Sequence, residues 1–235
     1  KVTNRTLLRI NVATPIHGVQ ECTFNTTAVK GSADYGMLYV GVGDGGAAGE
    51  GWTHVTTGNS RIWGSVIRID PFGKNSTNGQ YGIPNDNPFA KSKDADLCKE
   101  IYCRGFRNPN RIVWTPKGKM LITDIGQSNS EELNLGIPGG NYGWPDREGT
   151  FVVRPKAKID QVFPLPAGGD PVPYLYPVAH FDHDEGKAIS GGFVYTGQKI
   201  PALQGKYIFS DVTNGRFFFV DADKLKLGTQ STITE

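Results

Sequence analysis

The sequence predicts an all-β fold, and within that class a β-propeller built from four-stranded blades. The 31 glycines and 15 prolines are spread along the 235 residues, a distribution typical of many short strands joined by turns. No long stretch shows the periodicity of an amphipathic helix. A motif of glycine, a short apolar or aromatic run and aspartate recurs at residues 36–44, 118–126 and 205–215.

The spacing of this motif indicates the size of the repeat. Its copies begin 82 and then 87 residues apart, and each interval divides into two units of about 40 to 45 residues, the period of a propeller blade. We therefore expect about five blades' worth of sequence, with long surface loops at 72–99 and 146–175. Leu38, Leu121 and Ile208 should occupy equivalent inner-strand positions in three different blades.

Other strands follow from β-branched and apolar runs. We expect strands at residues 6–13 and 37–42, and a hairpin of 111–115 with 119–123 that turns at Pro116-Lys117-Gly118. The glycine-rich loop at 43–49 is not followed by a helix, so it does not predict a phosphate-binding loop. It either keeps side chains away from a site or is only a wide turn.

Charge and composition exclude some classes of function. A net charge of +2, from 25 basic and 23 acidic residues without a basic run, argues against a nucleic-acid partner. No apolar run approaches the roughly 20 residues that cross a bilayer, so we expect no membrane span. Sequons at Asn4, Asn25 and Asn75 favour an extracellular or periplasmic glycoprotein. The three cysteines, Cys22, Cys98 and Cys103, leave one thiol without an internal partner.

The segment from Glu100 to Pro145 combines strands with demanding turns. Pro109 disfavours a helical conformation at Asn108 and leaves Arg107 on an irregular corner. A guanidinium there offers a fork of donors suited to a carboxylate. The alternative is an arginine that only holds a neighbouring loop carbonyl.

Several ordered motifs together resemble one family. G-F-R-N-P, D-I-G-Q, E-E-L-N and G-G-N-Y-G-W-P follow L-Y-V-G-V-G-D-G-G and precede A-I-S-G-G-F-V-Y-T-G. In this order they are similar to the soluble PQQ-dependent glucose/sorbosone (aldose sugar) dehydrogenases, and the resemblance runs from His17 onward. It implies one domain over 1–235, part of a six-bladed β-propeller that is incomplete in this chain. It also implies PQQ- and calcium-dependent oxidation of aldose sugars at C1 to lactones by hydride transfer, with a separate electron acceptor.

The resemblance also assigns roles to residues. His17 matches the base that takes the proton of the sugar's anomeric hydroxyl, although a solvated loop histidine is the alternative. The remaining matches are Arg107, Asn108, Thr213 and Asn214 for binding PQQ, Gly126 and Gln127 for a calcium beneath it, and Glu132 and Tyr142 for a second calcium. A solvated acidic pair is the alternative for Glu132. Thr213 and Asn214 stand where part of the family has a lysine, and Arg216 follows them.

Two further possibilities remain open. His180, His183 and their acidic neighbours are either a polar loop at the rim or a transition-metal site. At the level of function, the rivals to an enzyme are a non-catalytic extracellular binding module, similar to hedgehog-interacting proteins, and a structural glycoprotein of a larger assembly. We also expect further sequence beyond the two ends, because the chain begins with Lys1 rather than Met.

Overall fold

The computed structural model describes residues 4–47, 61–94, 97–154 and 160–235. Within these residues, nearly all regular structure is antiparallel β-strand, and the one helical element is the short 3-10 turn η1 (Pro201–Leu203). This confirms the predicted all-β class. In the same residues, no helix has the length and apolar character needed to cross a membrane.

In the described ranges, the strands form three larger sheets and one small sheet. The first sheet consists of β1 (Val19–Phe24), β2 (Leu38–Val42), β3 (Ser65–Ile69) and β4 (Ile101–Arg104). The middle sheet consists of β5 (Pro109–Trp114), β6 (Met120–Asp124), β7 (Ser130–Leu135) and β11 (Ala179–Asp182). The last sheet consists of β12 (Ile189–Val194), β13 (Lys206–Asp211) and β14 (Phe217–Asp221). The small sheet consists of β8 (Arg147–Glu148), β9 (Phe151–Val153) and β10 (Val162–Phe163).

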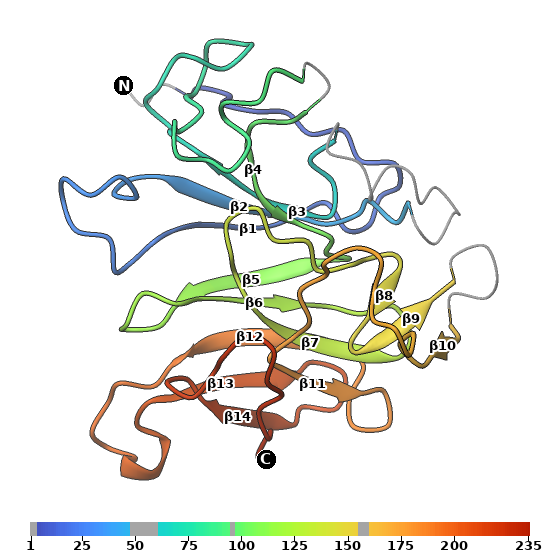
Figure 1. Cartoon of the computed structure of the whole chain (residues 1–235). Helices are drawn as coiled ribbons and strands as arrows, with labels where there is room; N and C mark the ends of the chain where they lie inside the picture. Colours follow the sequence, from blue (N-terminus) through green and yellow to red (C-terminus); the bar gives the residue numbers. More distant parts are fainter. Residues whose placement is uncertain (1–3, 48–60, 95–96, 155–159) are drawn as a thin grey trace.

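The three larger sheets lie one after another, from the first at the top of Figure 1 to the last at the bottom. Their opening strands are neighbours, since β5 lies against both β1 and β12. The side-chain amide of Asn110 on β5 donates to the carbonyl of Ile189 on β12 at 2.7 Å. The segments that lead into these opening strands are therefore brought to one region of the molecule.

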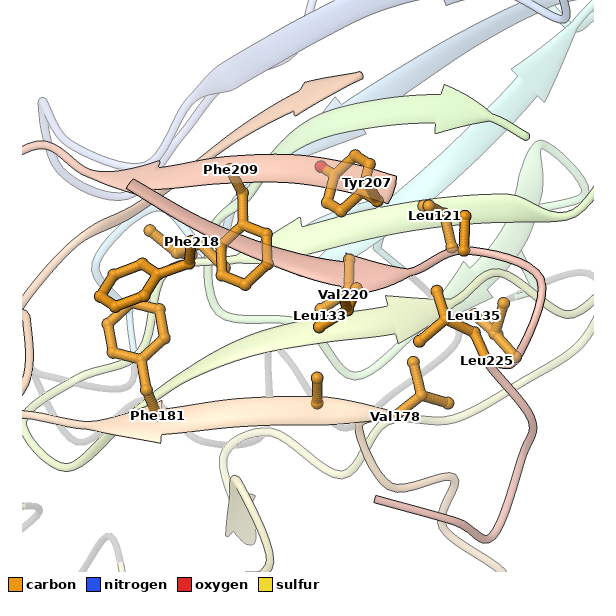
Figure 2. Packing of buried hydrophobic residues seen from close by; sticks show 13 residues of the cluster. Leu121, Leu133, Leu135, Val178, Phe181, Tyr207, Phe209, Phe218, Val220 and Leu225 are labelled. Atoms are coloured by element: carbon orange, nitrogen blue, oxygen red, sulfur yellow. The ribbon is translucent and has the colours of Figure 1, made fainter. Parts of the chain in front are cut away.

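Apolar side chains fill the space between neighbouring sheets. Between the middle and last sheets, Leu121 and Leu133 share one apolar cluster with aromatic residues of β13 and β14, among them Tyr207, Phe209 and Phe218 (Figure 2). A second cluster, which includes Tyr39, Phe106 and Trp114, joins the first and middle sheets. All five residues of β6 are buried, because this strand is covered on both faces.

The motif predictions have a mixed outcome. Leu38, Leu121 and Ile208 lie on the second strands of three different sheets, as predicted, but their positions are not all equivalent. Leu121 and Ile208 each stand three residues before the aspartate that ends the strand, whereas Leu38 is the first residue of β2. The division of each interval into two units is wrong, because each interval leads from one large sheet to the next. Long connections take up the remaining length, and one of them contains the small sheet.

The strand predicted at residues 6–13 is also wrong. This segment has no strand partner, and its carbonyl groups bind side chains instead: Leu7 accepts from Asn78, and Asn11 accepts from Trp63, both at 2.9 Å. Leu8 and Ile10 nevertheless pack against the apolar cluster of β2 and β3. The apolar pattern was therefore a signal of burial rather than of strand pairing. The hairpin of β5 with β6 is confirmed.

Candidate functional site

An aspartate stands at or just beyond the end of the second strand in each large sheet. These residues are Asp44, Asp124 and Asp211, and all three are buried. Each one binds the segment that leads into the opening strand of its own sheet. Because the opening strands are neighbours, the three aspartates fix three chain segments at the same end of the sheets.

In the first sheet, Asp44 binds the segment before β1, and this segment carries His17. Its Nδ1 lies 2.7 Å from Oδ1 of Asp44. The Asp44 carboxylate also accepts from the backbone N–H of Gly46 at 2.8 Å and from Nε1 of Trp144 at 2.9 Å. A carboxylate that already accepts two N–H groups favours a proton on Nδ1 of the histidine, which leaves Nε2 as a proton acceptor.

The backbone at His17 is strained. Among the described residues it is the one non-glycine residue with positive φ, at 51°. Such a conformation is unfavourable for a residue with a side chain, and it persists where the surroundings hold it in place. Here the carbonyl of His17 accepts from the N–H of Gly45 at 3.1 Å, and Gly18 accepts from Gly43 at 2.9 Å. The glycine loop thus presents the imidazole in a fixed direction.

The glycines of this loop are required by close approach. A Cβ on Gly43 would lie 2.4 Å from the carbonyl oxygen of His17 and 2.8 Å from Oδ1 of Asn108, and one on Gly46 would lie 2.5 Å from Oγ1 of Thr14. Of the two interpretations of residues 43–49, the described part supports a loop that keeps side chains away from a site. Residues 48–49 lie outside the described residues.

In the middle sheet, the corresponding segment carries Arg107 and Asn108. Their backbone N–H groups donate to Asp124 at 2.9 and 2.6 Å. The Arg107 side chain donates through Nε to Oε1 of Gln127 at 2.9 Å and through Nη1 to the carbonyl of Ile125 at 3.1 Å. The arginine therefore holds a neighbouring loop, and among the described residues its Nη2 has no hydrogen-bond partner.

His17 and Arg107 face one pocket. Its volume is about 380 Å³, and it is lined by Thr14, Pro15, Ile16, His17, Asp44, Gly46, Arg107 and Gln127. The structure thus brings together three of the residues predicted from the sequence, His17, Arg107 and Gln127. The predicted cofactor residue Asn108 is buried and is not among the lining residues, and Oδ1 of its amide has no hydrogen-bond partner among the described residues.

Buried acidic groups lie behind this pocket. Burial raises the pKa of Asp124 to about 7, against the opposing effect of the N–H groups and charge of Arg107 and the N–H of Asn108, and the negative charge of Glu131 adds to the rise. Burial and the charge of Asp124 also raise the pKa of Glu132, its partner across β6 and β7. The two carboxyl groups therefore compete to remain ionised.

The turn that carries Gly126 and Gln127 is fixed by another buried acid. Oε1 of Glu148 accepts the four consecutive N–H groups of residues 127–130 at 2.8 to 3.1 Å. The carbonyl oxygens of Gly126 and Gln127 accept no hydrogen bond from the described residues. Carbonyl oxygens that are not hydrogen-bonded are suitable ligands for a hard cation such as Ca²⁺.

Glu132 and Tyr142, predicted to share a second calcium, have separate partners. Glu132 accepts from the N–H of Gly149 at 2.6 Å and from Nδ2 of Asn134 at 2.9 Å. The ring of Tyr142 stacks on Phe106, and its hydroxyl accepts from a backbone N–H. Glu132 is buried, so the alternative of a solvated acidic pair is wrong. The shared calcium stays a prediction.

Thr213 and Asn214 lie outside the lining of the pocket. The N–H and hydroxyl of Thr213 and the N–H of Asn214 all donate to Oδ2 of Asp211, and the Asn214 side-chain amide donates to the carbonyl of Glu185. Arg216 donates to the carboxylate of Glu235 and to the same Glu185 carbonyl. These groups stabilise the turn between β13 and β14, and their role in binding PQQ stays a prediction.

The two histidines of the acidic segment bind different groups. His180 on β11 contacts Oγ of Ser130 at 3.0 Å, and His183 contacts the buried carboxylate of Glu131 at 2.9 Å. Asp182 accepts from the backbone of residues 184–186, which form a turn. The geometry is that of a polar loop, and among the described residues no group of three or more metal-ligating side chains comes together.

Sequence reasoning missed three residues of the site, namely Asp44, Trp144 and Glu148. A signal for Asp44 was present, because the repeated motif places an aspartate after each second strand. Trp144 and Glu148 lie far from their partners in sequence, and nothing local in the chain indicates those contacts. Their roles depend on how the sheets are arranged.

The structure thus defines an all-β protein with a histidine–carboxylate pair and an arginine in one pocket. The sequence profile of the family described as glucose/sorbosone dehydrogenase matches residues 25–235. The chain therefore belongs to this family.

Individual relatives agree with this assignment. The chain is 31% identical to the HIPL1 protein of Arabidopsis thaliana over 75% of its own length and 27% of that protein. It is 29% identical to quinoprotein glucose dehydrogenase B of Acinetobacter calcoaceticus over 67% of its length and 31% of that enzyme. The chain thus spans about a third or less of these relatives.

Solved structures share the fold. The chain aligns over its whole length with 57% of a putative glucose dehydrogenase of Thermus thermophilus, with a TM-score of 0.66 at 20% identity. It also aligns over 84% of its length with 45% of the PQQ-bound aldose sugar dehydrogenase of Streptomyces coelicolor, with a TM-score of 0.54 at 21% identity.

Proposed function

We propose that the protein is a PQQ- and calcium-dependent oxidoreductase that oxidises aldose sugars at C1 to lactones. The observation that carries this proposal is the convergence of His17, Asp44, Arg107 and Gln127 on one pocket of about 380 Å³. The family and the relatives named glucose and aldose sugar dehydrogenases support the class of reaction. The proposal includes closure of the complete protein into a six-bladed propeller outside the cytoplasm.

The groups on this pocket fit the proposed cofactors. PQQ carries three carboxylates and an ortho-quinone, and it needs cationic donors for the carboxylates. Arg107 offers Nη2 for this purpose, and the neighbouring Asn108 would contribute through the N–H groups of its side-chain amide. Gly126 and Gln127 would hold Ca²⁺ through their carbonyl oxygens. When bound, PQQ would supply the acceptor for the hydride, which carries both electrons of the oxidation.

The protein's own side chains have distinct tasks in this reaction. His17 accepts the proton of the C1 hydroxyl at Nε2, because Nδ1 is occupied by Asp44. Asp44 fixes the orientation of the imidazole and stabilises the imidazolium that forms. The indole N–H of Trp144 in turn holds Asp44. Arg107 orients the cofactor and takes no part in the proton transfer.

Reconstitution tests this function directly. The full-length protein is titrated with PQQ in the presence and absence of Ca²⁺, and binding is followed by calorimetry. Aldose-dependent reduction of a dye, together with detection of the lactone, then reports turnover. We expect calcium-dependent PQQ binding and sugar oxidation. A protein that binds no PQQ under these conditions would contradict the proposal.

One observation favours a second function. The HIPL1 and HIPL2 proteins are 31% and 28% identical to the chain, and their names state no reaction. A non-catalytic extracellular binding module is therefore the rival. Binding of PQQ without oxidation of any aldose would support this rival, because the fold would then be kept without the chemistry.

A further inference from the structure

We propose that Lys187 is a second cationic residue that binds a carboxylate of the cofactor beside Arg107. This inference rests on the proposed function, since it concerns the same anionic ligand; Lys187 itself lies outside the residues that line the pocket. It follows from the repeated way in which the sheets hold the segments before their opening strands.

Lys187 and Arg107 occupy equivalent positions in two sheets. In the middle sheet, Pro109 of β5 pairs with Asp124, and Arg107 lies two residues earlier. In the last sheet, Ile189 of β12 pairs with Asp211, and Lys187 also lies two residues earlier. Asp211 accepts the N–H groups of Lys187 and Ala188, both at 2.7 Å, just as Asp124 accepts those of Arg107 and Asn108.

The two equivalent positions are also close in space. Asn110 donates to the carbonyl of Ile189, so the starts of β5 and β12 lie side by side. One oxygen of Glu131 accepts both the N–H of Gly126 and the N–H of Ile189, at 3.4 and 2.8 Å. The turn that carries Gln127, the partner of Arg107, is therefore tied to the start of β12. Lys187 precedes that point by only two residues, about 7 Å of extended chain.

The ammonium group of Lys187 is available for a ligand. The side chain is exposed, and among the described residues it has no hydrogen-bond or ion-pair partner. Its neighbours Asp184 and Glu185 are exposed acids. Arg216, the other cation nearby, is already bound by Glu235 and the Glu185 carbonyl. A fixed backbone with an unpaired cation suits a ligand that carries several carboxylates.

Matched lysine variants test this role. Lys187→Gln removes the charge before β12, and Lys199→Gln removes the charge of an exposed lysine beyond the other end of the same strand. The dissociation constant of PQQ is measured with the full-length protein and Ca²⁺ over a series of salt concentrations. We expect Lys187→Gln to bind PQQ roughly tenfold more weakly with a shallower salt dependence. Lys199→Gln and Lys187→Arg should remain close to wild type.

A second measurement needs no variant. Lysine acetylation, followed by mass spectrometry, is compared with and without PQQ. We expect PQQ to protect Lys187 and to leave Lys199 reactive. Equal PQQ affinity of wild type and Lys187→Gln, or no protection of Lys187, would overturn the inference while leaving the proposed function intact. Wild-type protein that binds no PQQ would overturn both.

Discussion

Asp124 in the middle sheet and Asp211 in the last sheet hold equivalent positions, yet their environments differ. Both are buried, and both accept two backbone N–H groups of the segment before the opening strand. For Asp211, burial acts to raise the pKa, but hydrogen bonds from Thr213, Ala188, Asn214 and Lys187 outweigh it and lower the pKa. For Asp124, burial prevails and the pKa rises to about 7.

The number of protein donors explains this difference. Asp211 accepts five hydrogen bonds, which satisfy both of its oxygens. Asp124 accepts two and lies near Glu131 and Glu132, whose charges oppose its ionisation. A repeated motif can therefore serve as a structural cap in one sheet and support a polar site in another. The site differs from the cap because Asp124 accepts fewer hydrogen bonds from the protein than Asp211 does.

The substitution expected to have the largest effect on activity is His17→Ala, in the segment before the first sheet. His17→Ala removes the proposed base and should lower sugar turnover by about 100- to 10,000-fold, the usual contribution of a positioned general base. The affinity for PQQ should stay nearly unchanged, because His17 contacts the sugar rather than the cofactor carboxylates. Steady-state kinetics and calorimetry on the same preparations separate the two quantities. A variant as active as wild type would remove His17 from the mechanism.

Much of this site could be predicted from the sequence because its residues lie in local motifs. The turn residues around Arg107 and Gln127 stand in short segments with strong backbone preferences. Those motifs also resemble motifs of the family, and this resemblance is what assigned catalytic and cofactor-binding roles to their residues. The hairpin of β5 and β6 was equally local, since a short turn with a glycine at positive φ, 77° at Gly118, joins two apolar strands.

The remaining features depend on contacts between distant segments. Trp144 reaches Asp44 across 100 residues of sequence, and β11 joins the middle sheet after the small sheet has intervened. Residues 6–13 look like a strand because Leu8 and Ile10 are apolar, but apolar side chains also cover a sheet without pairing with it. The number of sheets between successive copies of the glycine–apolar–aspartate motif depends on the lengths of the loops. The spacing of the motif alone does not give those lengths.

The next largest effect is expected on the free energy of unfolding, when Asp124 and Asp211 are each replaced by asparagine. Asp211→Asn places an amide NH₂ where several N–H donors now meet a carboxylate, and it should lower the free energy of unfolding by about 3 kcal/mol. Asp124→Asn loses fewer hydrogen bonds and relieves repulsion from Glu132, so its effect should be about 1 kcal/mol. Urea denaturation at pH 7 measures both. If both substitutions lower the free energy of unfolding by the same amount, the two aspartates contribute equally to stability, and the proposed contrast between them is wrong.

A comparison of two arginines tests which sheets bind the cofactor. Arg107→Ala should weaken PQQ binding by about 2 to 3 kcal/mol, because a charge-assisted contact with a carboxylate is lost. Arg216→Ala is the matched control, since this guanidinium is already paired with Glu235 and lies outside the pocket lining. Calorimetric titration with PQQ should leave the Arg216 variant close to wild type. A larger loss at Arg216 would move the cofactor toward the last sheet.

The last comparison concerns the pH dependence of stability. The pKa of Asp124 is raised from 3.8 to about 7 on folding, so the folded state holds this proton more tightly than the unfolded state between these values. The stability contributed by this group is therefore present at low pH and is lost as pH rises through that window. We expect the free energy of unfolding to decline as pH rises toward 7, and the raised pKa of Glu132, the other member of this coupled pair, acts in the same direction.

Asp211 contributes with the opposite sign, because its pKa is lowered. Its stabilisation is present above about 3.8 and is lost only as pH falls further. Urea denaturation of wild type and Asp124→Asn at intervals from pH 4 to 8 isolates the Asp124 contribution as the difference between the two curves. As pH rises toward 7, the wild type should lose stability relative to Asp124→Asn. A difference that does not vary with pH would show that Asp124 titrates alike in the folded and unfolded states, and the contrast with Asp211 would then lie in hydrogen bonding alone.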